Sequence, residues 1–271
     1  MQSSKFRITL RGDEADDSLR LSDLIDQLNA VKNTLTQVDQ AVSGGKASLY
    51  YRVTNISMNS PATFEFEAVS KAKGNASHGR RVVAKLSRDL RRVIEGKRPR
   101  DAGLELLESY GALVQPMQRS HVAGVSMKFD DDAAIELPRN LAMKVDDILG
   151  PDQIEQGSVI GSLDVIDVHN QRNLFKIYPV VGPTSIRCLF QGPMFNDALA
   201  GIKKFVRVSG LLHYKKTEKF PHLIKVVSIE VLPEKSDRPS LSSLRGMAPG
   251  AYGGLSSTDY VDKVRNGDWQ A

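Results

Sequence analysis

The segment 157–232 constrains the fold most, because it alternates apolar and polar residues in short stretches separated by turn residues. The expected strands cover 158–168, 174–181, 185–191, 205–214 and 222–232. A helical pattern around 195–202 separates the third strand from the fourth. This order is typical of a small, partly open five-stranded barrel. We therefore expect an all-β domain at 157–232.

The preceding residues predict a separate domain, since a chain of 271 residues is long enough to bury two cores. The expected strands cover 5–11, 47–57, 63–70, 121–129 and 134–137, and the expected helices 23–43, 77–95, 101–113 and 141–149. Ser22 is the expected N-cap of the first helix, and Gly44 its C-terminal stop. Because the strands are joined by both turns and helices, we expect an α+β domain with an antiparallel sheet at 1–150.

Beyond Pro233 the composition shifts to Ser, Pro and Gly, which is typical of a flexible segment. We expect an extended C-terminal arm at 233–271. The arm ends in a short helical pattern, where Ser256 and Asp259 have the spacing of a capping box.

Positive charge is concentrated at 71–100. This segment contains eleven Lys and Arg residues but only two acidic residues, Asp89 and Glu95, whereas the whole chain has a net charge of +5. On a helical wheel the apolar residues of 77–95 share one arc, and cations occupy the other. Arg81, Lys85, Arg88 and Arg92 lie opposite the apolar arc, and Arg80 and Arg91 flank them. With few acidic partners at i±4 spacing, this face favours contacts with a phosphate backbone. The alternative is a solvated outer face without a ligand.

The expected barrel offers a second candidate surface for nucleic acid. If Phe175 and Ile177 point inward, then Lys176 and Tyr178 point outward, and Arg187 on the next strand can join them. In strand order, 157–232 resembles an OB-fold, and this resemblance implies binding of single-stranded nucleic acid on that face. A barrel that only docks a protein or acts as a spacer remains the alternative.

The terminal helical pattern suggests a partner-binding segment. Its candidate residues are Tyr260, Val261, Val264, Arg265 and Trp269. This tail resembles the C-terminal toxin-binding segments of antitoxins that pair with PIN-domain ribonucleases. The resemblance implies that Arg265 enters an acidic metal site of a toxin. The alternative is a tail helix that docks on its own protein and buries Trp269.

No catalytic signature accompanies these features. The five histidines lack a metal-binding spacing, and Cys188 is the only cysteine. We therefore expect a non-enzymatic binding protein without metal or cofactor, a nucleic-acid-associated regulator of the antitoxin or defence type. Its expected partners are DNA or RNA, and a toxin or another protein through the arm. A scaffold without nucleic-acid binding is the alternative, and an enzyme with dispersed catalytic residues ranks third.

The sequence shows no apolar segment of signal-peptide or membrane-spanning length. We accordingly expect a cytoplasmic protein without a membrane partner.

Overall fold

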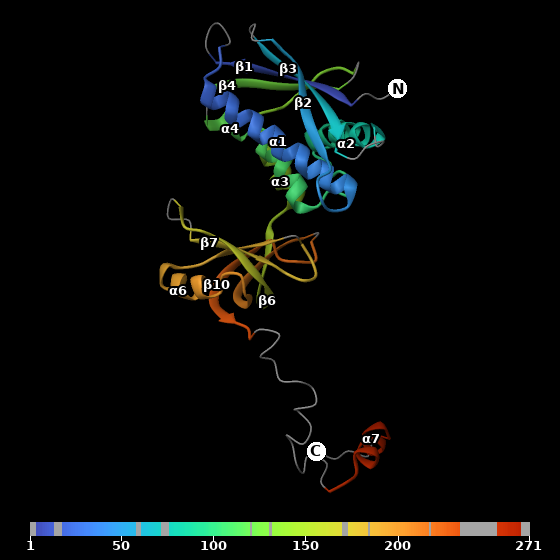
Figure 1. Ribbon diagram of the computed structural model, residues 1–271, viewed down its shortest axis with the longest axis vertical. Helices are drawn as coiled ribbons and strands as arrows, with labels where there is room; N and C mark the ends of the chain where they lie inside the picture. The colour runs from blue at the N-terminus through green and yellow to red at the C-terminus, as the bar shows by residue number, and fades with distance from the viewer. Residues whose placement is uncertain are drawn as a thin grey trace. The chain divides into compact units, whose positions relative to one another are not determined.

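The computed structural model describes residues 4–13, 18–57, 61–71, 76–119, 121–129, 132–169, 173–183, 185–216, 218–233 and 254–266. The chain divides into two compact units. The first comprises Met1–Gln156 with Leu211–Ile224, and the second comprises Gly157–Gly210 with Lys225–Ala271. Helices accompany two five-stranded sheets, so the protein is a mixed α/β protein (Figure 1).

The first sheet has the strand order β2-β3-β1-β4-β5, and its described pairings are antiparallel. Its strands are β1 (Lys5–Gly12), β2 (Leu49–Ser57), β3 (Ala62–Ser70), β4 (Val122–Phe129) and β5 (Ile135–Glu136). Along the central strand β1, Phe6, Ile8 and Leu10 are buried, while Arg7 and Arg11 are exposed. This alternation gives the sheet one face toward a core and one toward solvent.

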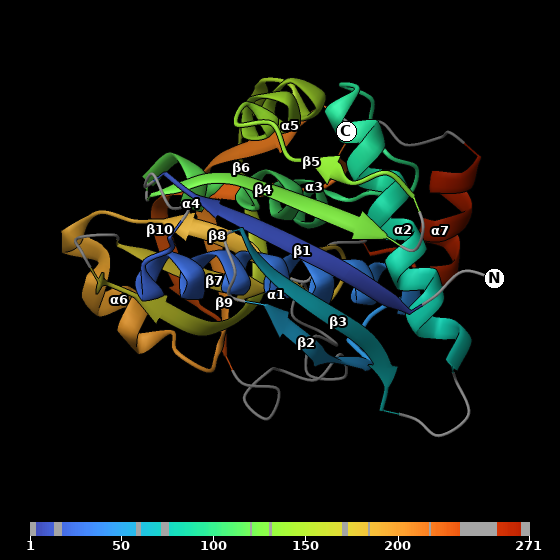
Figure 2. The same ribbon diagram turned by 90° about the horizontal axis from the view of Figure 1, so that it is seen from above.

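Helices cover the apolar face of this sheet, as Figures 1 and 2 show for α1, α2 and α3. The helices are α1 (Leu21–Ser43), α2 (Ala76–Ile94), α3 (Leu104–Ala112), α4 (Gln115–Arg119) and α5 (Leu141–Leu149). Gly79 allows α2 to approach β3 closely, because a Cβ at this position would lie 2.6 Å from the carbonyl oxygen of Ala68. The side chains between helices and sheet form one continuous core.

The expected start of α1 was wrong by two residues. Arg20 has extended backbone and occupies the N-cap position without a side-chain cap, while Ser22 lies inside the helix and bonds Asp23. The backbone amide of Leu24 already donates to the Arg20 carbonyl, so the helix begins before Ser22 can cap it. Gly44 ends the helix as expected, with a left-handed φ of 73° that suits glycine.

The second sheet closes into a ring in the order β10-β8-β7-β6-β9. Its strands are β6 (Asp152–Asp167), β7 (Leu174–Tyr178), β8 (Ile186–Leu189), β9 (Phe205–Lys215) and β10 (Leu223–Val231). A 3-10 turn, η2 (Gly192–Met194), and the helix α6 (Phe195–Ala200) separate β8 from β9. Phe175, Ile177 and Cys188 are fully buried. Gly210 permits a close strand approach, since a Cβ there would lie 2.0 Å from the Lys225 carbonyl oxygen.

The described part of the C-terminal arm contains the helix α7 (Ser257–Arg265). The expected cap is confirmed, because the Ser256 hydroxyl accepts a hydrogen bond of 3.1 Å from the backbone amide of Asp259. Trp269, one of the expected partner-binding residues, lies outside the described residues.

Candidate functional site

The helix α2 separates an apolar inner face from a cationic outer face. The inner face carries Val82, Val83, Leu86, Leu90 and Val93, all buried in the core of the first unit. The outer arc carries Arg80, Arg81, Ala84, Arg88, Arg91 and Arg92, with Lys85 at its border. The wheel deduced from the sequence therefore matches the burial of the helix in the structure.

One member of the expected cationic face belongs to a buried ion pair instead. The ammonium of Lys85 lies 2.8 Å from the carboxylate of Asp89, one turn further along α2, and its side chain is only 12% exposed. Lys85 also donates to the carbonyl of Arg100 over 3.4 Å. Asp89 is thus one of the few acidic i±4 partners expected for this face, and it meets Lys85 because both residues lie at the border of the apolar arc.

Asp89 is the only carboxylate of α2, and it is turned away from solvent. Besides Lys85, it accepts a hydrogen bond of 3.0 Å from the Tyr110 hydroxyl on α3. Burial, together with the Asp89 charge, raises the pKa of Tyr110 well above its ordinary value. The outer face of α2 therefore has no negative charge from its own helix.

Arg81 is held by a chain of buried groups that sequence analysis did not identify. Its guanidinium lies 3.3 Å from Nδ1 of His78, whose Nε2 lies 2.7 Å from a carboxylate oxygen of Asp39 on α1. Because a guanidinium can only donate, Nδ1 accepts, and Nε2 carries the proton donated to Asp39. The other Asp39 oxygen accepts from the backbone amides of Ser48 and Leu49. These hydrogen bonds fix the direction in which the Arg81 side chain extends from the helix.

The remaining predicted cations differ in their partners. Arg91 pairs with Asp132 over 3.1 Å, and both side chains are exposed. Arg92 donates to the carbonyl of Arg98. It also lies near Glu95, directly after α2, whose pKa is lowered by a hydrogen bond from Lys97 and, to a smaller extent, by the charge of Arg92. Within the described part of the chain, Arg80 and Arg88 make no ion pair. The outer face of α2 is therefore only partly compensated, and Arg80 and Arg88 are its cations without a carboxylate among the described residues.

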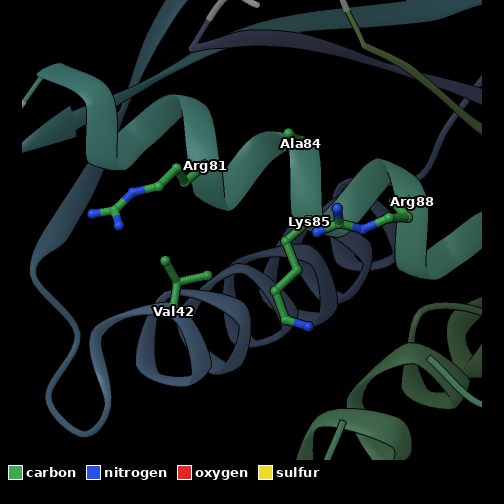
Figure 3. Close-up of a pocket in the computed structure, with 5 residues that line it drawn as sticks. All are labelled: Val42, Arg81, Ala84, Lys85 and Arg88. Carbon is green, nitrogen blue, oxygen red and sulfur yellow. The ribbon is translucent and has the colours of Figure 1, made fainter. Parts of the chain in front are cut away.

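A solvent-open hollow of about 310 Å³ lies beside this face. It is lined by Val42 of α1 and by Arg81, Ala84, Lys85 and Arg88 of α2. Figure 3 shows Arg88 extending along α2 toward Lys85, whereas Arg81 extends away from Lys85. The fold thus places three of the predicted cations around one concave site.

The residues of the second predicted surface lie on β7 and β8. Lys176 lies directly opposite Arg187 in the antiparallel register, and Tyr178 lies opposite Ser162 of β6. All three predicted side chains are partly exposed, whereas their neighbours Phe175 and Ile177 point into the ring.

Three of the partner-binding candidates on α7 form an apolar strip that is half-buried at Tyr260 and exposed at the two valines. Tyr260, Val261 and Val264 fall within about 100° of one another around the helix. The valines are 43% and 46% exposed. Arg265 is exposed but lies off this strip. The exposed apolar surface of the strip is therefore small and comes from Val261 and Val264.

Comparison of the chain with protein-family models, with curated proteins and with solved structures finds no match. Across the described ranges, no three His, Cys, Asp or Glu side chains are grouped so that they could hold a metal ion. Of the helices in the described part of the chain, none is long and apolar enough to cross a membrane.

Proposed function

We propose that this protein binds nucleic acid through the outer face of α2. The observation that carries the proposal is the charge on that face: Arg80, Arg81, Arg88, Arg91 and Arg92 are turned outward, and the only carboxylate of the helix is buried. Lys and Arg side chains that neutralise phosphates release counterions, and this release drives most binding to a nucleic-acid backbone.

Other exposed arginines of the same unit favour this proposal over a merely solvated face. On the solvent side of the sheet, Arg7 pairs with Glu65 and Arg52 pairs with Glu67. The hydrogen bond from Arg52 lowers the pKa of Glu67, so both partners stay charged. The sheet thus compensates its surface cations, while the outer face of α2 leaves Arg80 and Arg88 without a carboxylate among the described residues.

The second unit supplies a secondary contact in this proposal. Its ring of five strands with a helix between β8 and β9 supports an OB-like barrel, and Lys176, Tyr178 and Arg187 would face a single strand. The exposed strip on α7 would bind a partner protein. Together, these features support a non-enzymatic regulator of the antitoxin or defence type.

The salt dependence of binding tests the role of α2. Replacing Arg80, Arg81 and Arg88 with Gln should reduce the slope of log affinity against log salt, because each lost phosphate contact removes up to about 0.9 from the slope on duplex DNA and about 0.7 on single strands. The slope is measured by titrating labelled duplex and single-stranded oligonucleotides at several salt concentrations.

The matched control replaces three exposed arginines that already pair with carboxylates: Arg7, Arg52 and Arg207. This variant removes the same formal charge from other surfaces, and its slope should stay close to that of the unmodified protein. Equal slopes for all three proteins would rule out α2 as the contact surface.

A further inference from the structure

We infer that the hollow beside α2 is a binding site for a phosphate monoester, the dianionic group found at the end of a nucleic-acid strand or on a small phosphorylated molecule. The strand-end version rests on the proposed function, since it assigns a part of the same cationic face to one feature of the nucleic acid. The site itself depends only on the geometry of the hollow.

The cations of the hollow come from successive turns of one helix. Arg81, Lys85 and Arg88 are spaced at i, i+4 and i+7, so their Cα atoms span about 10 Å along the axis. A guanidinium offers parallel donors that match two oxygens of a phosphate. The ammonium of Lys85 adds N–H donors, although its charge is offset by Asp89. These side chains surround one concavity, so a single anion can meet more than one of them.

Two of the three cations are held in place before any ligand arrives. His78 and Asp39 hold Arg81, and Asp89 with the Arg100 carbonyl holds Lys85. Donors that are already ordered lose less conformational entropy on binding. The carboxylates of Asp39 and Asp89 lie in the core behind the donors, so they do not occupy the hollow.

Arg88 completes the site from the solvent side. It is exposed, and among the described residues it makes no ion pair or hydrogen bond that would draw it away. Val42 and Ala84 form small apolar walls between the cations, which leaves room for the sugar or other group that carries the phosphate. The volume of about 310 Å³ lies at the small end of ligand sites.

The charge of the ligand follows from the number of donors. A phosphodiester carries one negative charge, while a phosphate monoester carries about −1.5 to −2 at pH 7 and has three free oxygens. The rest of the outer face of α2 can bind diesters one cation at a time. The hollow brings the guanidinium groups of Arg81 and Arg88 together with the N–H donors of Lys85, so the three free oxygens of a monoester can be bound at once.

The test compares short single-stranded oligonucleotides of one sequence that end in a 5′-phosphate, a 3′-phosphate or hydroxyl groups only. Binding of the full chain is measured by fluorescence anisotropy, alongside calorimetric titration with inorganic phosphate and with a nucleoside monophosphate. We expect one phosphorylated end to bind about tenfold more tightly than the hydroxyl end, a difference of about 1.4 kcal/mol.

Two variants locate that preference. Arg88→Gln should abolish the preference for the phosphorylated end, and because Arg88 is exposed, the fold should survive. Arg91→Gln removes an exposed cation of the same helix that does not line the hollow, and it should keep the preference. Loss of the preference in both variants, or in neither, would overturn the assignment to the hollow.

The remaining outcomes separate this inference from the proposed function. Oligonucleotide binding with the expected salt slope but no preference for a phosphorylated end would overturn the inference and leave the proposed function standing. Binding of inorganic phosphate or the monophosphate that depends on Arg88, without oligonucleotide binding, would support the site and overturn the nucleic-acid role. Absence of both would overturn both.

Discussion

Individual side chains of α2 have two distinct tasks that the sequence does not separate. Lys85 and Arg88 lie on neighbouring turns and look equivalent on a helical wheel. In the structure, Lys85 neutralises the buried Asp89, whereas Arg88 lies exposed at the edge of the hollow. Their substitutions should therefore affect different properties of the protein.

Replacing Lys85 with Met should lower the free energy of unfolding by about 3 kcal/mol, because it leaves Asp89 buried without its cation. Arg88→Met, one turn away, should change it by less than about 0.5 kcal/mol. Urea denaturation of both variants measures the difference. Since Asn keeps an acceptor for Tyr110 without a charge, adding Asp89→Asn to Lys85→Met should recover part of the loss, and no recovery would contradict the buried pair.

At the scale of elements, a polar cluster within the first unit ties the start of β6 to the hairpin between β9 and β10. Asp152 accepts hydrogen bonds of 3.1 Å from both His213 and His222, and it pairs with Lys215 at 2.8 Å. Burial by itself raises the pKa of the Asp152 carboxyl, but the bonds from Lys215, His222 and His213 outweigh it and lower the pKa to about 2.

This cluster predicts a pH dependence of stability. A carboxyl with a lowered folded-state pKa stabilises the fold above its unfolded pKa, near 3.8, and loses that contribution as the pH falls toward 2. Because the side chain is partly exposed, solvent screening reduces this contribution to about 1 kcal/mol. Urea denaturation between pH 2 and 6 should show a steeper fall in stability for the unmodified protein than for Asp152→Asn. Parallel curves would contradict the assignment.

At the scale of the whole molecule, the arm should be dispensable for folding. The apolar strip of α7 is exposed at Val261 and Val264, and a helix of nine residues is marginal by itself. Deleting 246–271 should shift the thermal midpoint by no more than about 2 °C while abolishing capture of a partner protein. Scanning calorimetry and affinity purification measure the two effects. A large fall in the midpoint would instead show that the arm docks on its own protein.

The positions of most elements followed from sequence because each pattern is local. Leu141–Leu149 was expected with the same limits, and the strands of the ring were located to within a few residues apart from the early start of β6. Gly44 and Ser256 marked a helix end and a helix start through chemistry confined to a few neighbouring residues. The prediction of Ser22 as the N-cap was wrong because Arg20, which lacks a capping side chain, occupies that position.

Only part of the candidate site could be predicted from the sequence. The cationic face of α2 follows from helical periodicity, and the spacing of Lys85 and Asp89 was a usable signal for their pairing. By contrast, nothing local links His78 to Asp39, which lies 39 residues earlier on another helix. Only the packing of α1 against α2 brings this pair together and directs Arg81.

The sequence by itself determined the order of strands and helices, the concentration of charge on α2 and the short capped helix of the arm, because periodicity and capping act within a few residues. The tertiary structure decided which cations are exposed and which are neutralised. A charge in the core must find a partner wherever the fold supplies one, as Asp89 finds Lys85 and Tyr110. The hollow beside α2 also depends on the tertiary structure, since its walls come from two helices that meet only in the folded chain.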